Sequence, residues 1–227
     1  MLYFTGDTHG DQARLLYYMD YKKFAPEDYL IVCGDFGFVF RDNDSEREFI
    51  QRLEAFPCTI CFVDGNHENF AALNRYPEES WNGGRIHRIS KGIIHLMRGQ
   101  VFTIDGKTLF TMGGAYSIDR YMRKLGESYW EEELPCDAEY KEATANLARH
   151  NNQVDYIVTH TAPREMILRM GYNPDVHDLE LTGFLEYILY EVSYTHWYCG
   201  HWHDDKDITD KFTVLWHEIR NEDNIVR

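Results

Sequence analysis

The chain has 227 residues, of which 44% are hydrophobic and 27% are charged, which is enough for one sizeable core. Its 23 Lys and Arg against 38 Asp and Glu give a formal net charge of −15. A chain this acidic is not expected to bind nucleic acid or an anionic membrane through bulk charge. No stretch approaches the roughly 18 consecutive apolar residues that a membrane-spanning helix needs.

The compartment is indicated by the start of the chain and by its cysteines. The residues before Asp7 include no basic residue and no long apolar stretch, so we expect no secretory signal. Five cysteines are an odd number at low density, which is typical of reduced thiols and not of a disulfide framework. We therefore expect a cytoplasmic protein. No repeat or linker divides the sequence, so we expect a single domain over residues 1–227.

Short apolar runs alternate with helical patterns in the first part of the chain. The runs 2–5, 29–33 and 59–63 are too short for helices and are predicted strands. Apolar residues at helical spacing predict helices over 12–24 and 45–56. This alternation implies βα units around a largely buried sheet.

The middle of the chain changes character. Residues 85–113 hold several short β-rich runs, and Asp105-Gly106 between two of them is a strong hairpin signal. Further along, 130–151 and 179–192 are predicted helices, and 155–159, 194–199 and 212–216 are predicted strands. We expect a layered α/β domain with helices outside and with residues 116–152 as a small peripheral cap.

Polar side chains follow five of the predicted strands. They are Asp7, His9, Asp35, Asn66, His67, His160, His201 and His203. Ligands of open α/β sheets gather beyond the carboxyl ends of the strands, so these side chains are expected to converge on one crevice. Glycines at 6, 34, 65 and 200 fit sharp turns where the backbone passes close to that crevice.

The types of these residues point to metal ions. Imidazole nitrogen and carboxylate oxygen suit Mn, Fe, Zn, Co or Ni, and no cysteine accompanies them. All except His67 are candidate ligands, which is too many for one tetrahedral ion and fits two adjacent ions. Two cations about 4 Å apart repel strongly, so one carboxylate, Asp35 by preference, is expected to bridge them. A bridging hydroxide would complete the shells and supply a nucleophile.

Five blocks of sequence in this order resemble the calcineurin-like metallophosphoesterase family. They are D-T-H at 7–9, G-D at 34–35, G-N-H-E at 65–68, T-H at 159–160 and G-H-W-H at 200–203. Each block is weak alone, but five in order, each after a predicted strand, are a strong signal. The resemblance implies a four-layer α/β/β/α sandwich of two mixed sheets flanked by helices.

The resemblance also implies a role for each residue. Asp7, His9 and His203 would bind the first metal ion, Asn66, His160 and His201 the second, and Asp35 would bridge. His67 matches the catalytic histidine, which would contact the phosphate and protonate the leaving oxygen. Two divalent ions are therefore expected, Mn²⁺ first, with Fe, Zn or Ni as alternatives. The expected reaction is attack on phosphorus by the bridging hydroxide.

The second block departs from the pattern of the protein serine/threonine phosphatases in this superfamily. Those enzymes read G-D-x-V-D-R-G, whereas this chain reads G-D-F-G-F-V-F, without the second acid and the Arg. The acidic partner of His67 and a phosphate-binding Arg are therefore missing. The segment 113–123 offers Arg120 and Arg123 as replacements that could bind phosphate, and Asp119 could orient one of them.

The sequence thus predicts a phosphodiesterase or phosphatase acting on small or nucleotide-like phosphate esters. One alternative is a non-catalytic scaffold of the same fold, which the complete ligand set argues against. Another is a nuclease on single strands or ends, which would need a basic channel built by Arg85, Arg88, Lys91 and Arg98. Trp202 is expected either to face the pocket or to pack beneath it.

Overall fold

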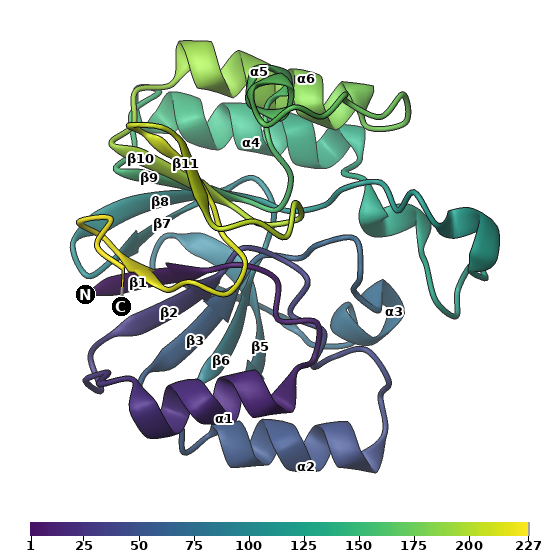
Figure 1. The fold of residues 1–227 in the computed structure, drawn as a ribbon, viewed down its shortest axis with the longest axis vertical. Helices are drawn as coiled ribbons and strands as arrows, with labels where there is room; N and C mark the ends of the chain where they lie inside the picture. Colours follow the sequence, from purple (N-terminus) through teal and green to yellow (C-terminus); the bar gives the residue numbers. More distant parts are fainter. Residues whose placement is uncertain (227) are drawn as a thin grey trace.

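Two mixed β-sheets lie face to face at the centre of the molecule in a computed structural model that describes residues 1–226 (Figure 1). The strands of the first sheet are β1 (Leu2–Thr5), β2 (Tyr29–Val32), β3 (Thr59–Phe62), β4 (Glu78–Trp81), β5 (Gly84–Ser90), β6 (Ile93–Leu96) and β13 (Arg220–Asn221). They lie in the order β13-β1-β2-β3-β6-β5-β4. Because β1, β2, β3 and β6 are parallel, the carboxyl ends of these strands lie at one edge of the sheet.

The second sheet supplies the other half of that edge. Its strands are β7 (Gln100–Ile104), β8 (Lys107–Met112), β9 (Tyr156–Thr159), β10 (His196–Cys199), β11 (Lys206–Thr209) and β12 (Phe212–Val214). They lie in the order β11-β12-β10-β9-β8-β7, with β8, β9, β10 and β12 parallel. The predicted hairpin joins β7 and β8, where Asp105 (φ 50°) and Gly106 (φ 74°) take the left-handed conformations of a two-residue turn.

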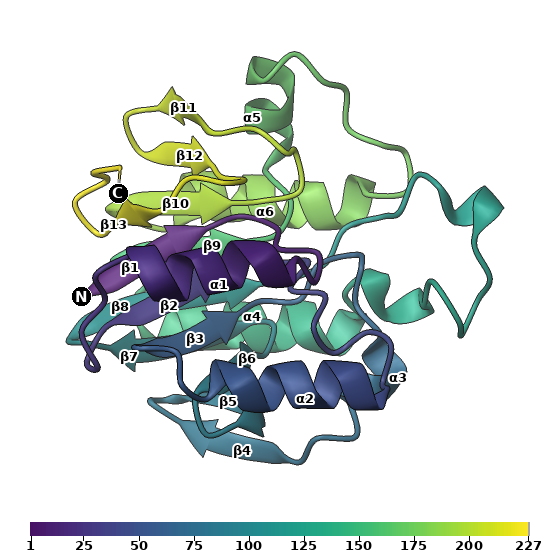
Figure 2. The ribbon, with the colours of Figure 1, turned by 60° about the horizontal axis from the view of Figure 1, so that its bottom comes forward.

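Helices cover the outer faces of both sheets, which makes four layers (Figures 1 and 2). On the first sheet lie α1 (Gln12–Tyr21) and α2 (Asp44–Leu53), and α3 (Phe70–Leu73) is a single turn. On the second lie α4 (Asp137–Arg149), α5 (Arg164–Arg169) and α6 (Leu179–Glu191). Three apolar clusters fill the spaces between the four layers. The α/β/β/α sandwich expected from the resemblance is confirmed.

The helix ends follow local capping chemistry. The Asp11 side chain accepts a hydrogen bond from the Arg14 N–H at the start of α1, and Asn43 accepts one from Glu46 at the start of α2. The helix predicted over 130–151 begins later, at Asp137, after the short 3₁₀ turn η2 (Glu131–Glu133). The reason is Pro135, which disfavours helical backbone at the residue before it, so the helix restarts beyond it.

Residues 116–152, expected as a cap, divide into two parts. Residues 116–136, which include the 3₁₀ turn η1 (Arg120–Met122), project from the body of the molecule in both views (Figures 1 and 2). In contrast, α4 packs on the second sheet and buries Ala143 and Leu147 in its apolar cluster. Among residues 1–226, no helix combines the length and apolar character that crossing a membrane requires.

Candidate metal centre

The loops after β1, β2, β3, β9 and β10 meet at one edge of the two sheets. Close approach there depends on glycine: a Cβ on Gly65 would lie 2.0 Å from Asp35 Oδ1, and one on Gly200 would lie 2.1 Å from Asp7 Oδ1. The same loops hold His9, Asp35, His201 and His203 at positive φ (47°, 47°, 68° and 48°). Non-glycine residues rarely adopt this conformation, and such strain concentrates at functional sites.

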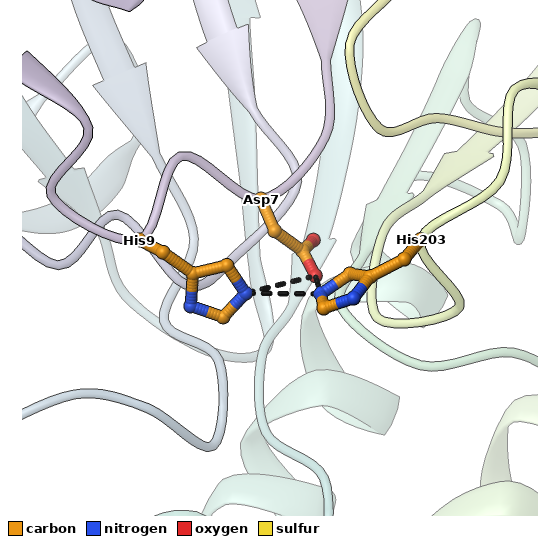
Figure 3. A group of neighbouring side chains, drawn as sticks. All are labelled: Asp7, His9 and His203. Atoms are coloured by element: carbon orange, nitrogen blue, oxygen red, sulfur yellow. Dashed lines mark hydrogen bonds and ion pairs between the residues drawn. The ribbon is translucent and has the colours of Figure 1, made fainter. Parts of the chain in front are cut away.

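The first group of side chains is Asp7, His9 and His203 (Figure 3). His203 Nε2 lies 3.1 Å from Asp7 Oδ2 and 2.9 Å from His9 Nε2. The ligand atoms of all three residues lie within 4.8 Å of one another, which is close enough to hold one ion. Sequence reasoning assigned these residues to the first metal ion.

The second group is Asn66, His160 and His201, and it lies beside the first. Asn66 Oδ1 is 2.9 Å from His160 Nε2 and 3.1 Å from His201 Nδ1. Asp35 lies between the groups, since its Oδ2 is 3.7 Å from His9 Nε2 and 3.6 Å from His160 Nε2. Asp7, Asp35 and His160 also have ligand atoms within 4.8 Å of one another. The seven predicted ligands therefore form two adjoining donor sets with a carboxylate between them.

The hydrogen bonds around the second group test whether a cation fits there. Asn66 Nδ2 donates to Ser117 Oγ at 2.9 Å, which leaves Oδ1 facing the histidines. His160 Nδ1 lies 3.0 Å from the Cys33 carbonyl oxygen and donates to it, so in the neutral ring, the form that binds a metal ion, Nε2 carries the lone pair. Two acceptor atoms then face each other at 2.9 Å. A cation between them relieves this repulsion, so the donor set fits a metal ion.

The titration behaviour of the ligands points the same way. Burial opposes ionisation of Asp7, but a hydrogen bond from His203 and the charge of His160 outweigh it and lower the pKa of Asp7 to about 2. Burial lowers the pKa of His201 to about 3, which keeps its nitrogen lone pair free. Asp7 and Asp35 are each 1% exposed. Although burial opposes it, the charges of Asp35 and Asp7 raise the pKa of His160, and the pKa of His203 is raised by its hydrogen bond to Asp7. The buried carboxylates thus attract positive charge, which favours cations at this site.

His67 has an unusual partner in place of the acid that sequence reasoning found missing. Its imidazole lies against Arg123, whose Nη2 is 2.6 Å from His67 Nδ1 and 3.0 Å from Nε2. Arg123 Nε in turn donates to Asp119 Oδ2 at 2.8 Å, the pairing expected for Asp119. The backbone N–H of His67 donates to Asp35 Oδ1 at 2.7 Å. Within residues 1–226, no carboxylate is hydrogen-bonded to the His67 ring.

Arg120, the other arginine singled out in the sequence, turns away from the donor sets. Its Nη2 lies 2.9 Å from Glu133 Oε2, and its guanidinium covers the rings of Tyr116 (4.3 Å) and Tyr129 (5.1 Å). Glu133 is fully buried. Arg120 therefore fastens the projecting segment 116–136 together, while Arg123 is the arginine that reaches the site.

Three residues near the donor sets escaped sequence reasoning. Ser117 holds the Asn66 amide. Arg14 is buried and donates to the Asp7 carbonyl at 2.6 Å, and Glu68 Oε1 accepts the Phe36 N–H at 2.7 Å beside Asp35. Glu68 lies inside the G-N-H-E block and Ser117 inside the 113–123 segment, so position in the sequence marked both. Arg14 lies on the buried face of α1 beside Leu15 and Tyr18. An arginine among the apolar positions of a helix is unusual and could have indicated a buried polar role.

Two cavities flank the donor sets, and His67 lines both. One, of about 260 Å³, is lined by His9, Gly37 and Arg41 among others. The other, of about 550 Å³, is lined by His201, His203 and Trp202 and extends under residues 116–119. Trp202 thus faces the pocket, where its ring stacks on Tyr172 at 4.9 Å.

The basic residues considered for a nucleic-acid channel are largely neutralised. Arg85 pairs with Glu78 and Glu142, and Arg88 pairs with Glu79. Arg98 is buried against Asp64, with its Nη2 2.6 Å from Asp64 Oδ2. Three of the four residues thus have acidic partners, which argues against a free basic channel.

One family of known proteins matches most of this chain. The model of the calcineurin-like phosphoesterase family matches residues 2–205. One solved structure, Termus thermophilus sulfate thiohydrolase SoxB in complex with glycerol, aligns with 11% identity and a TM-score of 0.41, over 85% of this chain and 35% of that chain. This chain therefore spans about a third of that protein's length. A comparison with curated proteins gives no significant match.

The matched range 2–205 contains all five sequence blocks and both donor sets. Members of this family are, in general, metal-dependent phosphoester hydrolases that use divalent ions. The protein belongs to the calcineurin-like phosphoesterase family.

Proposed function

We propose that the chain is a dinuclear metal-dependent phosphodiesterase or phosphatase that acts on small or nucleotide-like phosphate esters. The observation that carries this proposal is the pair of adjoining donor sets with the Asp35 carboxylate between them. Asp7, His9 and His203 would hold one ion, and Asn66, His160 and His201 the other. Mn²⁺ is the proposed metal, with Fe, Zn and Ni as alternatives.

Divalent ions at these positions would supply charge neutralisation for phosphate oxygens and an activated water as the nucleophile. The chain's own residues would orient the ester. His67 lines both flanking cavities, so it can reach the leaving oxygen of a phosphate held at the donor sets. We assign it proton donation to that oxygen, which matters most for poor leaving groups. Burial and the charge of Arg123 lower the pKa of His67, so this role requires the negative charge of the bound phosphate to favour the protonated ring.

Arg123 is the proposed phosphate-binding arginine. Its guanidinium is next to His67, and its Nε is held by Asp119 at 2.8 Å, so less conformational freedom is lost when it binds a substrate. A bidentate guanidinium would hold a phosphate oxygen in the way the arginine absent from the second block does elsewhere in the superfamily. Arg120 contributes through Glu133, by shaping the segment that carries Arg123.

Metal analysis paired with hydrolysis assays tests the proposal. Bis-p-nitrophenyl phosphate and p-nitrophenyl phosphate are assayed with and without Mn²⁺, and the ratio of the two rates separates diesterase from monoesterase. We expect two ions per chain and metal-dependent turnover. Asp35→Ala should lose both, whereas Asp210→Ala, which removes an exposed carboxylate in the turn before β12, should keep both. Protein that binds no stoichiometric metal after reconstitution would favour the scaffold alternative.

A further inference from the structure

The larger cavity beside the donor sets is lined by acidic and aromatic side chains. It measures about 550 Å³ and opens directly onto Asp35, Asn66 and His201. The acidic residues on its lining beyond the donor sets are Asp119, Asp175 and Asp178, and no Lys or Arg lies on the lining. Whatever chemical group extends from a phosphate held at the donor sets into this cavity meets these side chains.

Two of the three acidic side chains have no counter-ion. Asp119 is neutralised by Arg123. Asp175 and Asp178 form no ion pair with any residue in the described range 1–226. Asp175 Oδ1 accepts only the His177 N–H at 2.8 Å, and Asp178 Oδ1 accepts the Tyr116 N–H at 2.7 Å. Neither carboxylate therefore has a direct ion pair, and the positive charges that act on Asp178 are the more distant ones of His160 and Arg120.

Ionisation of Asp178 is costly. Asp178 is only 5% exposed. The ionised form of a buried carboxylate is strongly disfavoured when no cation is paired with it. Burial accordingly raises the pKa of Asp178 to about 6. A positively charged group bound in the cavity would stabilise the ionised Asp178 carboxylate, whereas a neutral or anionic group would not.

The aromatic side chains suit the same kind of group. Tyr172 and Trp202 stack with their ring centres 4.9 Å apart, and the rings of Trp202 and the proposed ligand His201 are nearly perpendicular with centres 5.1 Å apart. The stacked pair therefore adjoins the donor sets, and both of its rings line the cavity. Indole and phenol rings attract cations through their negative faces, and Tyr172, which is 49% exposed, is accessible to a group that enters from solvent.

We propose that this cavity binds the alcohol part of a phosphodiester substrate and that this alcohol carries a positively charged amine or quaternary ammonium group. The inference rests on the proposed function, because it places the phosphate at the two donor sets. A second phosphate in the cavity would face Asp175 and Asp178 with no cation on the lining. A flat neutral ring could stack on Tyr172, but it would leave the buried Asp178 without a counter-charge.

Two substrates of the same shape test the charge directly. p-Nitrophenyl phosphorylcholine carries the quaternary ammonium, and p-nitrophenyl 3,3-dimethylbutyl phosphate has a neutral carbon in its place; both release p-nitrophenol. Assays at pH 8 keep Asp178 ionised, since its pKa is about 6. We expect kcat/KM for the charged substrate to exceed that for the neutral one by about tenfold or more.

The variants Asp175→Asn and Asp178→Asn should bring this ratio toward one, and asparagine keeps the acceptor for the Tyr116 N–H. Glu180→Gln is the matched control, because Glu180 is exposed in the first turn of α6 and lies outside the lining. It should leave the ratio unchanged. Equal loss of activity on both substrates in Asp178→Asn would mean that this carboxylate only balances the charge of the metal centre, and would overturn the inference.

Bis-p-nitrophenyl phosphate separates this inference from the proposed function. Metal-dependent hydrolysis of that diester, together with a wild-type preference for the neutral substrate, overturns only the cationic alcohol. Failure to hydrolyse any of the three diesters with bound metal present would overturn the proposed function itself.

Discussion

Replacing Ser117 by alanine should weaken the second metal site and leave the first intact. Asn66 and Ser117 are 3% and 2% exposed, and the Asn66 Nδ2–Ser117 Oγ hydrogen bond of 2.9 Å fixes which end of the amide faces the histidines. Without the hydroxyl, the amide is free to rotate and present Nδ2 to the lone pair of His160 Nε2. An ion would then have to displace that new hydrogen bond.

The size of the effect follows from the loss of one orienting contact. Outer partners of metal ligands are typically worth about 10–100-fold in metal affinity, or about 1.4–2.7 kcal/mol. Titration of the metal-free protein with Mn²⁺ should show one ion bound as in wild type, through Asp7, His9 and His203. The second ion should bind about 10–100-fold more weakly.

Ser90→Ala is the matched control for this variant. Its buried Oγ has no hydrogen-bond partner among the described residues, so its removal should not change metal binding. If Ser117→Ala binds both ions with wild-type affinity, the Asn66 amide is oriented by some other contact and the reasoning fails. Equal weakening of both sites would instead indicate general damage to the loop.

Three further expectations rest on other parts of the structure. Arg123→Ala should raise the KM for phosphate esters by about tenfold or more and Arg120→Ala by much less, because only Arg123 contacts His67; equal effects in steady-state kinetics would contradict this assignment. Arg98→Ala leaves the buried Asp64 carboxylate without its arginine and should lower the free energy of unfolding by about 3–5 kcal/mol in urea titrations, and a loss below about 1 kcal/mol would argue against it. Burial lowers the pKa of His196 to about 4, so the unfolded chain takes up a proton first as pH falls below about 6.5 and stability drops by up to about 3 kcal/mol toward pH 4. His196→Gln should remove that part of the pH dependence, and an unchanged slope would refute it.

The His67–Arg123–Asp119 contact gives a physical reason for the altered second block. The proposed phosphate-binding arginine, Arg123, and its acid come from the projecting segment 116–136 and not from the loop after β2. Two contacts tie that segment to the body: Arg98 Nη2 donates to the Glu132 carbonyl at 2.7 Å, and the Tyr116 N–H donates to Asp178 Oδ1 at 2.7 Å. The Arg120–Glu133 ion pair holds the segment together internally. These contacts fix the path of a long loop that carries Arg123 to His67.

Much of the fold follows from local sequence. The strands that lead into the site are short apolar runs between turn residues, and each was predicted to within three residues of its observed bounds at either end. The helices α1, α2 and α6 were likewise predicted from the spacing of apolar residues along the chain. Elements with little apolar pattern were not predicted: β4 and β11 are largely exposed edge strands, and α5 is less than two turns long.

The proposed metal ligands could be named from the sequence because each lies within a few residues of the end of its strand. A residue within two or three positions of the end of a parallel strand lies at the edge of the sheet where the strands end. Asp7, Asp35 and His160 therefore lie close together regardless of the conformation of the longer loops. What only the tertiary structure decided are contacts between residues distant in sequence: Arg123 and not Arg120 against His67, Ser117 on the Asn66 amide, and Asp178 in the cavity beside Trp202. These contacts depend on where the long segment 116–136 and the loop between α5 and α6 fold back. No local periodicity encodes that path, because it is fixed by packing and by buried ion pairs that form only in the folded chain.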